Sequence, residues 1–254
     1  MKWYKSLQTS KGRDKGRAFL VEGHRSIQLI GQVDCHRIRE IIYSEDMKEI
    51  SGLACPLRRV SSAQFRSISL SRHPTGPLAV VSMPDDCDSG ELPEACGRKI
   101  LVLEDIQDPG NAGTLVRSAA AFDFAGIVYS DKCADLFSPK AVQASCGAIV
   151  SMWLRRTPAY RAIMGSLKSR GFRIVAADVR GSELKMKFSE GENLALVLGN
   201  EGAGISPETL CIAHDVVKIP FNDTKVESLN VAASGAILMY LTRINRDSRP
   251  AFTL

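Results

Sequence analysis

The fold is decided by residues 218–241, KIPFNDTKVESLNVAASGAILMYL, where a short strand pattern leads through a polar turn into an apolar helix. We expect the strand to end at Pro220, because proline fixes φ and donates no hydrogen bond to a sheet. From Ser228 onward, small and apolar residues recur at helical spacing, and Ser228 is well placed to cap the helix. A helix N-terminus offers unpaired N–H groups and a positive dipole end to a small polar ligand. Residues 227–230 are therefore expected to border a ligand site.

The composition is that of an ordinary globular protein with room for two modest domains. The chain has 254 residues, of which 44% are hydrophobic and 24% are charged. It contains no apolar run of about 18 residues, the length that a membrane-spanning helix needs. Its first 13 residues also lack the apolar core of a signal peptide. We therefore expect a cytoplasmic protein without a membrane partner.

The cysteines predict neither a disulfide framework nor a metal site. They number seven, are scattered along the chain and include no Cys-x-x-Cys pair. In such a pattern cysteines usually act as small buried apolar residues. We expect buried, inert thiols and no bound metal.

The net charge of +5 is concentrated at the start of the chain. Residues 1–25 hold seven basic and two acidic side chains, an excess equal to that of the whole protein. Such a segment can bind the phosphates of RNA, and the candidate contacts are Lys11, Arg13, Lys15 and Arg17. The alternative is a solvated amphipathic helix without a binding role, and charge alone does not decide between the two.

Residues 1–82 are predicted to form a small α/β domain, followed by a linker. Strand patterns and helical patterns alternate along this part of the chain. Residues 83–97, MPDDCDSGELPEACG, are acidic and rich in turn-forming residues, as linkers are. The predicted strands cover residues 18–23, 38–43, 57–60 and 78–83, and the predicted helices lie around residues 27–30 and 61–67.

Residues 98–254 are predicted to form a mostly parallel sheet with helices on both faces. Residues 100–103 have the length and composition of a strand that is buried on both faces. Each later strand pattern is followed by a helix or a long crossover, as in a parallel sheet. Residues 178–193 are expected to be a surface segment. The further strands are predicted at residues 126–129, 172–177, 194–198 and 216–220.

A polar motif, DPGNAGTLVR at residues 108–117, follows the strand at residues 100–103. Asn111 or Thr114 is predicted to cap the next helix. Arg117 falls outside the apolar face of that helix, near the carboxyl end of the strand, where ligands bind in open α/β sheets. A solvated helix arginine is the alternative, but Asn111 and Gly113 at these offsets favour a functional role.

A glycine-rich loop, GNEGAG at residues 199–204, follows another buried strand. Three glycines in six residues allow the backbone to approach a ligand closely. The order Gly-x-x-Gly-x-Gly differs from the dinucleotide fingerprint Gly-x-Gly-x-x-Gly, and no acidic residue follows at the end of a second strand. A nicotinamide site is therefore not expected.

Taken together, three segments resemble the motifs of the SpoU/TrmH family of RNA ribose 2′-O-methyltransferases. They are DPGNAGTLVR (108–117), LVLGNEGAGI (196–205) and VESLNVAASGAI (226–237), in the order that the family has. Three ordered motifs are far more specific than one glycine pattern. Residues 1–82 resemble the ribosomal-protein-like RNA-binding domain that often precedes the catalytic region, chiefly through residues 13–23.

The resemblance implies S-adenosylmethionine as the cofactor, a deep C-terminal trefoil knot and a homodimer formed through the knotted region. It implies RNA, and not DNA, as the partner. Residues 98–254 would then be the methyltransferase domain. The expected cofactor contacts are Leu198, Gly199, Glu201, Gly204, Ile219, Ser228 and Leu229.

The family's central catalytic residue falls on Arg117. Because arginine stays protonated, we expect Arg117 to hold the target phosphate and to stabilise the forming alkoxide, and not to act as a base. Asn111 and Asn230 are expected to orient the hydroxyl or the arginine. Glu201 would pair with a guanidinium, and Ser228 would add a hydrogen bond or act only as the helix cap.

Several alternatives stay open. Ribosomal RNA is favoured as the substrate because of the N-terminal domain, and transfer RNA is the alternative. Knotted base methyltransferases share the cofactor fold but do not need Asn-x-Gly-x-x-x-Arg, so Asn111 and Arg117 count against them. A non-catalytic RNA-binding protein on the same fold is a third possibility.

Overall fold

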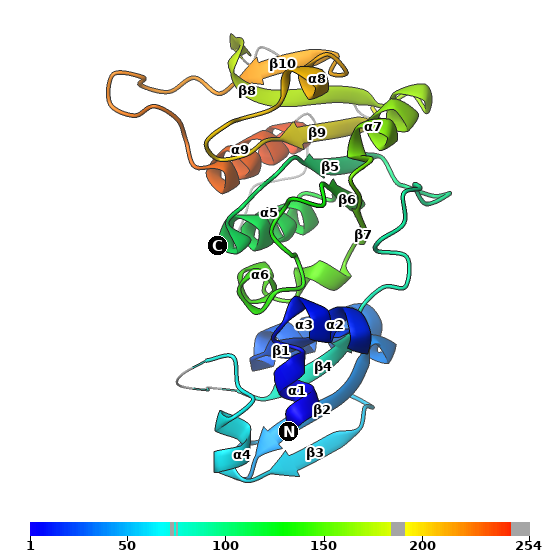
Figure 1. Cartoon of the computed structure of the whole chain (residues 1–254), viewed down its shortest axis with the longest axis vertical. Helices are drawn as coiled ribbons and strands as arrows, with labels where there is room; N and C mark the ends of the chain where they lie inside the picture. Colours follow the sequence, from blue (N-terminus) through cyan, green and yellow to red (C-terminus); the bar gives the residue numbers. More distant parts are fainter. Residues whose placement is uncertain (72–73, 75, 184–190, 245–254) are drawn as a thin grey trace. The chain divides into compact units, whose positions relative to one another are not determined.

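The chain forms two compact units in the computed structural model, which describes residues 1–71, 74, 76–183 and 191–244 (Figure 1). The first unit comprises Met1–Asp88, Asp108–Arg117 and Ala134–Leu154, and the second comprises Ser89–Gln107, Ser118–Cys133 and Arg155–Leu254. Within the described residues, no helix is both long and apolar enough to cross a membrane.

A four-stranded mixed sheet lies at the centre of the first unit, in the order β1-β4-β2-β3. The β1–β4 and β2–β4 pairs are antiparallel, and the β2–β3 pair is parallel. All four strands were predicted to within one residue at each end. Their bounds are Ala18–Glu22 for β1, Ile38–Ser44 for β2, Leu57–Val60 for β3 and Leu78–Ser82 for β4.

Short helices surround this sheet, and local capping explains where two of them begin. The Thr9 hydroxyl accepts a hydrogen bond from the Gly12 N–H at 3.2 Å and so caps α2. Ser61 and Gln64 form a reciprocal capping box at the start of α4. The helices are α1 (Lys2–Ser6), α2 (Ser10–Gly16), α3 (His24–Asp34), the 3₁₀ turn η1 (Cys35–Arg37) and α4 (Ser62–Arg66).

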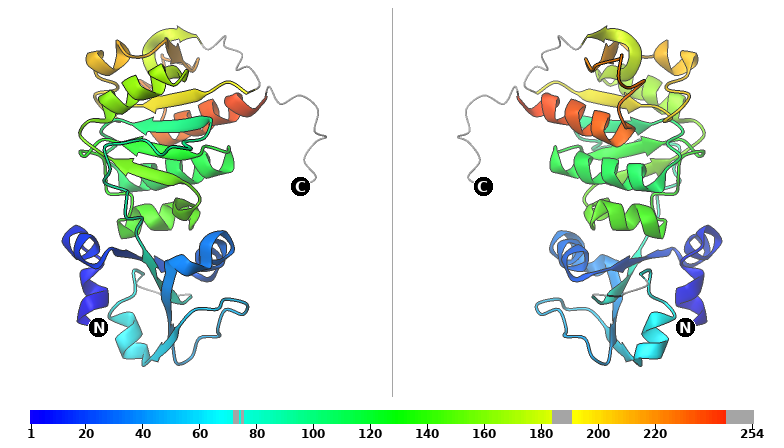
Figure 2. Two further views of the ribbon diagram at one scale, coloured as in Figure 1. Left: turned by 90° about the vertical axis from the view of Figure 1, so that its right-hand side faces the viewer. Right: turned by 90° about the vertical axis from the view of Figure 1, so that its left-hand side faces the viewer.

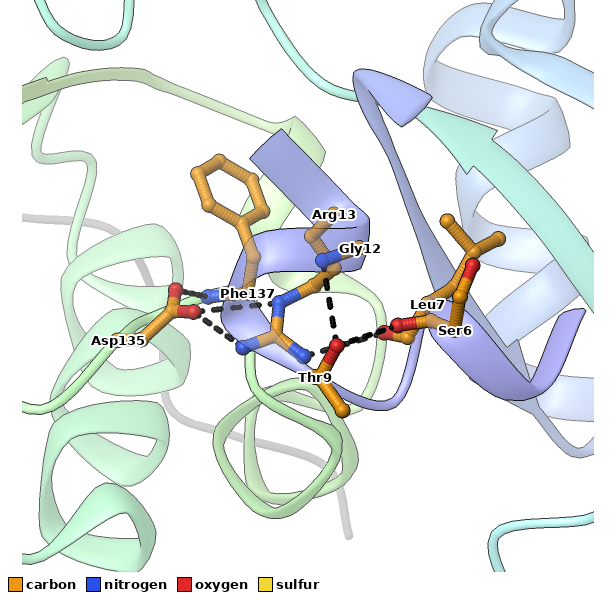
Figure 3. Close-up of polar contacts among 7 residues, drawn as sticks. All are labelled: Ser6, Leu7, Thr9, Gly12, Arg13, Asp135 and Phe137. Atoms are coloured by element: carbon orange, nitrogen blue, oxygen red, sulfur yellow. Dashed lines mark hydrogen bonds and ion pairs between the residues drawn. The ribbon is translucent and has the colours of Figure 1, made fainter. Parts of the chain in front are cut away.

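The same unit includes α6 (Pro139–Ser145) and the 3₁₀ turn η2 (Ala148–Val150), which pack against the N-terminal elements. The rings of Phe19 and Phe137 lie 5.1 Å apart, centroid to centroid. Gly147 has a φ of +86°, and a Cβ there would lie 2.7 Å from the Ser26 carbonyl oxygen, so only glycine fits. Figure 3 shows a polar contact in this region, in which the Arg13 guanidinium points at the Asp135 carboxylate.

A six-stranded sheet in the order β10-β8-β9-β5-β6-β7 dominates the rest of the chain. The pairings from β10 through β6 are all parallel, as predicted. Its inner strands β5 and β9 are buried along nearly their whole length, which explains their unbroken apolar sequences. The bounds are Lys99–Leu103 (β5), Gly126–Tyr129 (β6), Trp153–Arg156 (β7), Arg173–Glu183 (β8), Leu194–Leu198 (β9) and Asp215–Lys218 (β10).

Helices flank this sheet on both faces. Figure 2 shows α7 and α9, both in the second unit, on opposite sides of the sheet. These helices are α5 (Pro109–Ala121), α7 (Tyr160–Ser169), α8 (Pro207–Leu210) and α9 (Val231–Ile244).

The strands of this region differ in part from the prediction. Residues 178–183 lie mostly at the surface, as expected, but β8 continues through them and pairs Ser182 and Glu183 with β10. Residues 184–190 of the predicted segment lie outside the described residues. The strand β7 and the helices α7 and α8 were not predicted.

The predicted linker, residues 83–97, contains neither helix nor strand. Cys87 and Cys96 within it are buried, so the segment is held against the protein. None of the seven cysteines is paired in a disulfide, and all of them lie in the described part of the chain. The prediction of buried thiols holds for Cys87, Cys96 and Cys133 but is wrong for Cys211, which is exposed, and Cys35, Cys55 and Cys146 are half-buried.

Candidate active site

A cavity of about 440 Å³ lies beside β8, β9 and β10 in the second unit. Its wall combines apolar side chains with the backbone of two loops. All seven residues that were expected to contact a cofactor line this cavity, together with Asn230. The lining residues are Ala177, Asp178, Val179, Leu198, Gly199, Asn200, Glu201, Gly202, Gly204, Val217, Lys218, Ile219, Phe221, Glu227, Ser228, Leu229, Asn230, Val231 and Ser234.

The loop at residues 199–204, here called the glycine loop, is closed by its own hydrogen bonds. The backbones of Asn200 and Gly204 exchange two hydrogen bonds of 3.0 Å each. The Asn200 side-chain oxygen accepts from the N–H groups of Gly202 at 2.9 Å and Ala203 at 2.8 Å. Gly204 has a φ of +72°, in the region that favours glycine. The loop therefore presents a fixed backbone surface to the cavity.

Two contacts tie the glycine loop to the segment after β5. The Asn200 amide donates to the Asp105 carbonyl oxygen at 2.7 Å. The Glu201 carboxylate accepts a hydrogen bond from the Gln107 N–H at 3.0 Å, and Glu201 is otherwise exposed. Glu201 thus binds a backbone amide of this segment, and its expected pairing with a guanidinium stays a prediction.

Replacing Gly199 with alanine is expected to lower the free energy of unfolding by about 1–3 kcal/mol. A Cβ at Gly199 would lie 2.5 Å from the backbone of Gly204, so the loop would have to shift. Gly202 is the matched control in the same loop, because a Cβ there would first meet another atom at 3.6 Å. Urea unfolding of both variants checks this, and equal effects at the two positions would contradict it.

A buried carboxylate outside the three motifs, that of Asp178, forms part of the cavity wall. The Asp178 side chain is 3% exposed and pairs with Arg180, whose Nε and Nη2 donate to it at 2.7 and 2.8 Å. The Arg180 Nη2 also donates to the Ile205 carbonyl oxygen at 3.1 Å. These hydrogen bonds from Arg180 hold the pKa of Asp178 below its usual 3.8. Asp178 directly follows the predicted strand at residues 172–177. A polar residue at the carboxyl end of a strand could have been recognised from the sequence as a site candidate.

Asp178 is expected to stabilise the fold at neutral pH and to lose this effect in acid. A carboxyl group whose pKa is lowered on folding stabilises the protein above its unfolded pKa, and the contribution disappears as the pH falls through the folded pKa. The free energies of unfolding of the wild type and Asp178→Asn should differ by a constant amount at neutral pH, and the difference should shrink below pH 3.8. A pH-independent difference down to pH 2 would contradict this expectation.

The helix α9 begins at Val231, and Asn230 is its cap. The Asn230 side-chain oxygen accepts from the N–H groups of Ala232 at 2.9 Å and Ala233 at 3.2 Å. The expectation that Ser228 caps this helix is therefore wrong, since the polar turn runs two residues further. Ser228 is exposed and lines the cavity without a capping role.

The first motif lies on α5, and Asp108 caps this helix. The Asp108 carboxylate accepts from the Asn111 N–H at 2.9 Å and binds the Lys140 ammonium at 2.7 Å. The predicted caps Asn111 and Thr114 are thus wrong, because the helix starts earlier, at Pro109. Asn111 is half-buried on the first turn.

Arg117 lies on the same helix with its side chain exposed, as its place outside the apolar face predicted. Its Nη1 lies 3.4 Å from the Cys146 sulfur. Neither Arg117 nor Asn111 is among the residues that line the cavity. The structure therefore brings the residues of the second and third motifs together at the cavity, and the first motif stands on its own helix.

The four N-terminal basic candidates differ in their surroundings. Lys11 and Lys15 are exposed. Arg13 is 3% exposed, and its guanidinium bonds to the Asp135 carboxylate and to the Leu7 carbonyl oxygen (Figure 3). The half-buried Arg17 bonds to the Pro84 carbonyl oxygen and to Asp88. Arg13 is therefore committed to protein acceptors and does not present its charge at the surface.

Comparison with known proteins places this geometry in a family. Residues 98–240, more than half of the chain, match the family model described as SpoU rRNA Methylase family. The chain is 29% identical over 247 residues to the 23S rRNA (guanosine(2553)-2′-O)-methyltransferase RlmP of Bacillus subtilis, covering 96% of this chain and 95% of that protein. It is 27% identical to the 23S rRNA (uridine(2479)-2′-O)-methyltransferase of Streptomyces viridochromogenes, covering 94% of this chain and 86% of that protein.

A solved structure shares the fold along nearly the whole chain. The SpoU methyltransferase AviRb of Streptomyces viridochromogenes, in complex with its cofactor AdoMet, superposes with a TM-score of 0.81. It is 25% identical, and the match covers 98% of both chains. Since three motifs, the parallel sheet and the family model agree, the chain belongs to the SpoU rRNA methylase family.

Proposed function

We propose that this chain, an RNA 2′-O-methyltransferase of the SpoU family, transfers the methyl group of S-adenosylmethionine to a ribose 2′-hydroxyl of ribosomal RNA. The observation that carries the proposal is the cavity, in which the glycine loop and the turn before α9 meet. Relatives that match along almost the whole chain are named for methylation of 23S rRNA, and this supports ribosomal RNA over transfer RNA.

The cavity suits S-adenosylmethionine. Its volume of about 440 Å³ lies within the range for small-molecule sites. Leu198, Ile219 and Leu229 give it an apolar wall, and the backbone of Gly199 and Gly204 offers polar groups at close approach. Glu201 and Ser228 add polar side chains at its edge. When bound, S-adenosylmethionine supplies a methyl group on a positively charged sulfur.

Transfer requires the ribose oxygen to be aligned and its developing negative charge to be stabilised. Arg117 is the residue for this task, because its guanidinium is exposed and offers planar donors to a phosphate or to an alkoxide. Asn111, on the first turn of the same helix, orients the hydroxyl or the arginine. Asn230 and Glu201 act at the cavity, where they fix the turn before α9 and the glycine loop.

The chain divides its work between residues 1–82, which select the RNA, and residues 98–254, which carry out methylation, with residues 83–97 as the linker. Lys11 and Lys15 on α2 are exposed and are the proposed phosphate contacts. Arg13 and Arg17 are left out of this set, because their guanidinium groups bond to the protein itself. A cytoplasmic location agrees with bacterial relatives that act on ribosomal RNA.

The C-terminal region forms a trefoil knot, as the family resemblance implies. Stretching single molecules from both ends would test this, because a knotted chain extends to less than the contour length of its residues. A full contour length would contradict the knot.

The functional protein is a homodimer through α9. Ile237 and Tyr240 are 41% and 49% exposed, and with the exposed Ala233 they form an apolar stripe at helical spacing. Ile237→Glu is expected to convert a dimer into a monomer in sedimentation analysis, because a carboxylate would be buried in the interface. Val33→Glu is the control, since Val33 is similarly exposed, at 45%, but belongs to another helix, α3. A wild-type monomer would contradict the proposal.

The function itself is tested by incubating purified protein with methyl-labelled S-adenosylmethionine and ribosomal RNA, then mapping labelled nucleosides by mass. A labelled 2′-O-methyl nucleoside is expected. Label on a base would contradict ribose methylation, and label only on transfer RNA would contradict the substrate. Binding of RNA without binding of S-adenosylmethionine would indicate a non-catalytic protein.

A further inference from the structure

We propose that Asp178 and Arg180 form a clamp that positions the glycine loop for S-adenosylmethionine, so that both residues determine cofactor affinity without taking part in methyl transfer. This inference rests on the proposed function, since it names the cofactor of that same cavity. Neither residue belongs to the three sequence motifs.

The clamp is built from hydrogen bonds of good geometry. Arg180 binds the Asp178 carboxylate through two nitrogens, at 2.7 and 2.8 Å, and the Arg180 backbone N–H donates to the same carboxylate at 2.9 Å. Paired donors on one carboxylate fix the plane of the guanidinium. With its plane fixed, Arg180 donates to the Ile205 carbonyl oxygen at 3.1 Å. Asp178 thus aims Arg180, and Arg180 holds the residue that follows the glycine loop.

The loop has an anchor on each side. On one side, Asn200 and Glu201 bond to the backbone after β5. On the other side, the clamp joins Ile205 to β8. Asp178 itself lines the cavity, and a Cβ on Gly204 would lie 3.5 Å from its carboxylate. The loop is rigid within itself, so loss of one anchor displaces it as a body relative to the cavity wall.

The exposure of the two side chains makes the proposal testable. Arg180 is 58% exposed, so replacing it disturbs no core packing. Asp178 is buried, and Asp178→Asn keeps its shape while removing its charge. A matched control lies on the same strand, because Arg173 pairs with Asp215 at 2.7 Å and does not line the cavity.

Calorimetric titration of the full chain with S-adenosylmethionine and with S-adenosylhomocysteine tests the clamp. Arg180→Met is expected to raise the dissociation constants of both compounds by about tenfold, because a charged hydrogen bond to the loop is lost. Asp178→Asn is expected to raise both by a smaller factor. Arg173→Met should leave both unchanged. At saturating cofactor, kcat of Arg180→Met should match that of the wild type, as expected for a residue that acts in binding.

The two compounds separate positioning from simple electrostatics. S-adenosylhomocysteine lacks the sulfonium charge, so a misplaced loop weakens both compounds alike. If Arg180→Met bound S-adenosylmethionine more tightly and S-adenosylhomocysteine unchanged, the pair would act only through charge and the clamp would be overturned. Unchanged affinity for both compounds would overturn it as well. A wild-type protein that binds neither compound would instead refute the proposed function.

Discussion

Replacing Arg117 with alanine is expected to lower the rate of methyl transfer by about two to three orders of magnitude. The proposed role of Arg117 is to bind the charge that develops on the ribose oxygen, and an alanine offers no donor there. Because the Arg117 side chain is exposed, its loss should leave folding intact. Initial rates with saturating cofactor, together with the melting temperature, measure the two effects separately.

Two further variants sharpen this test. Arg117→Lys keeps the positive charge but loses the planar pair of donors, so its rate should fall between those of the wild type and the alanine variant. Arg161→Ala removes an exposed arginine from α7, whose ion pair with Glu208 is 3.9 Å long, and should leave the rate unchanged. A rate for Arg117→Ala within about twofold of the wild type would remove Arg117 from the reaction, because a lost oxyanion contact costs far more.

Arg13→Ala is expected to lower the free energy of unfolding by about 3 kcal/mol, the lower end of the range for breaking a buried ion pair. The Arg13 side chain is 4% exposed and that of Asp135 is 23% exposed. Without Arg13, the Asp135 carboxylate would therefore lose its charged partner while being only partly solvated. The Leu7 carbonyl oxygen would also lose its donor. Urea unfolding measures the change as a shift in midpoint.

An exposed ion pair in the same unit is the control. The side chains of Arg59 and Glu49 form an ion pair of 2.8 Å and are 47% and 44% exposed. Arg59→Ala should lower the free energy of unfolding by about 0–1 kcal/mol, as is usual for surface ion pairs. If Arg13→Ala cost no more than Arg59→Ala, the Arg13–Asp135 pair would not hold the first unit together. Cofactor affinity of Arg13→Ala should stay at the wild-type value, since Arg13 is not among the residues that line the cavity.

Most strands could be predicted because a strand buried in a sheet has a recognisable run of apolar residues in the local sequence. The apolar runs at Lys99–Leu103 and Leu194–Leu198 match strands that are buried on both faces. The strand β7, Trp153–Arg156, ends in two arginines and has no such signature, so it was missed. The order of strands in the sheet depends on contacts between distant segments, which local periodicity does not encode.

The site could be predicted where sequence motifs mark the loops that line the cavity. It could not be predicted where a side chain binds a residue that is distant in the sequence. Gly199 and Leu229 line the cavity that the motifs indicated. The cap of α9 was misassigned, because Ser228 and Asn230 both have capping side chains and the path of the turn selects the second. Arg13 was assigned to RNA from its charge, whereas its partner Asp135 lies 122 residues further along the chain.

The packing of α6 and η2 against the N-terminal elements limits which segments can be exchanged between members of this family. If residues 1–82 select the RNA, as proposed, exchanging them as a cassette is the direct way to alter that choice. In this chain, however, Arg13, Phe19 and Ser26 have their partners Asp135, Phe137 and Gly147 in a segment that lies beyond the first motif. A chimera that imports only a foreign cassette would break three matched pairs at once. A cassette transferred together with residues 134–154 would keep them, so an exchange that preserves these contacts needs two separate pieces of sequence.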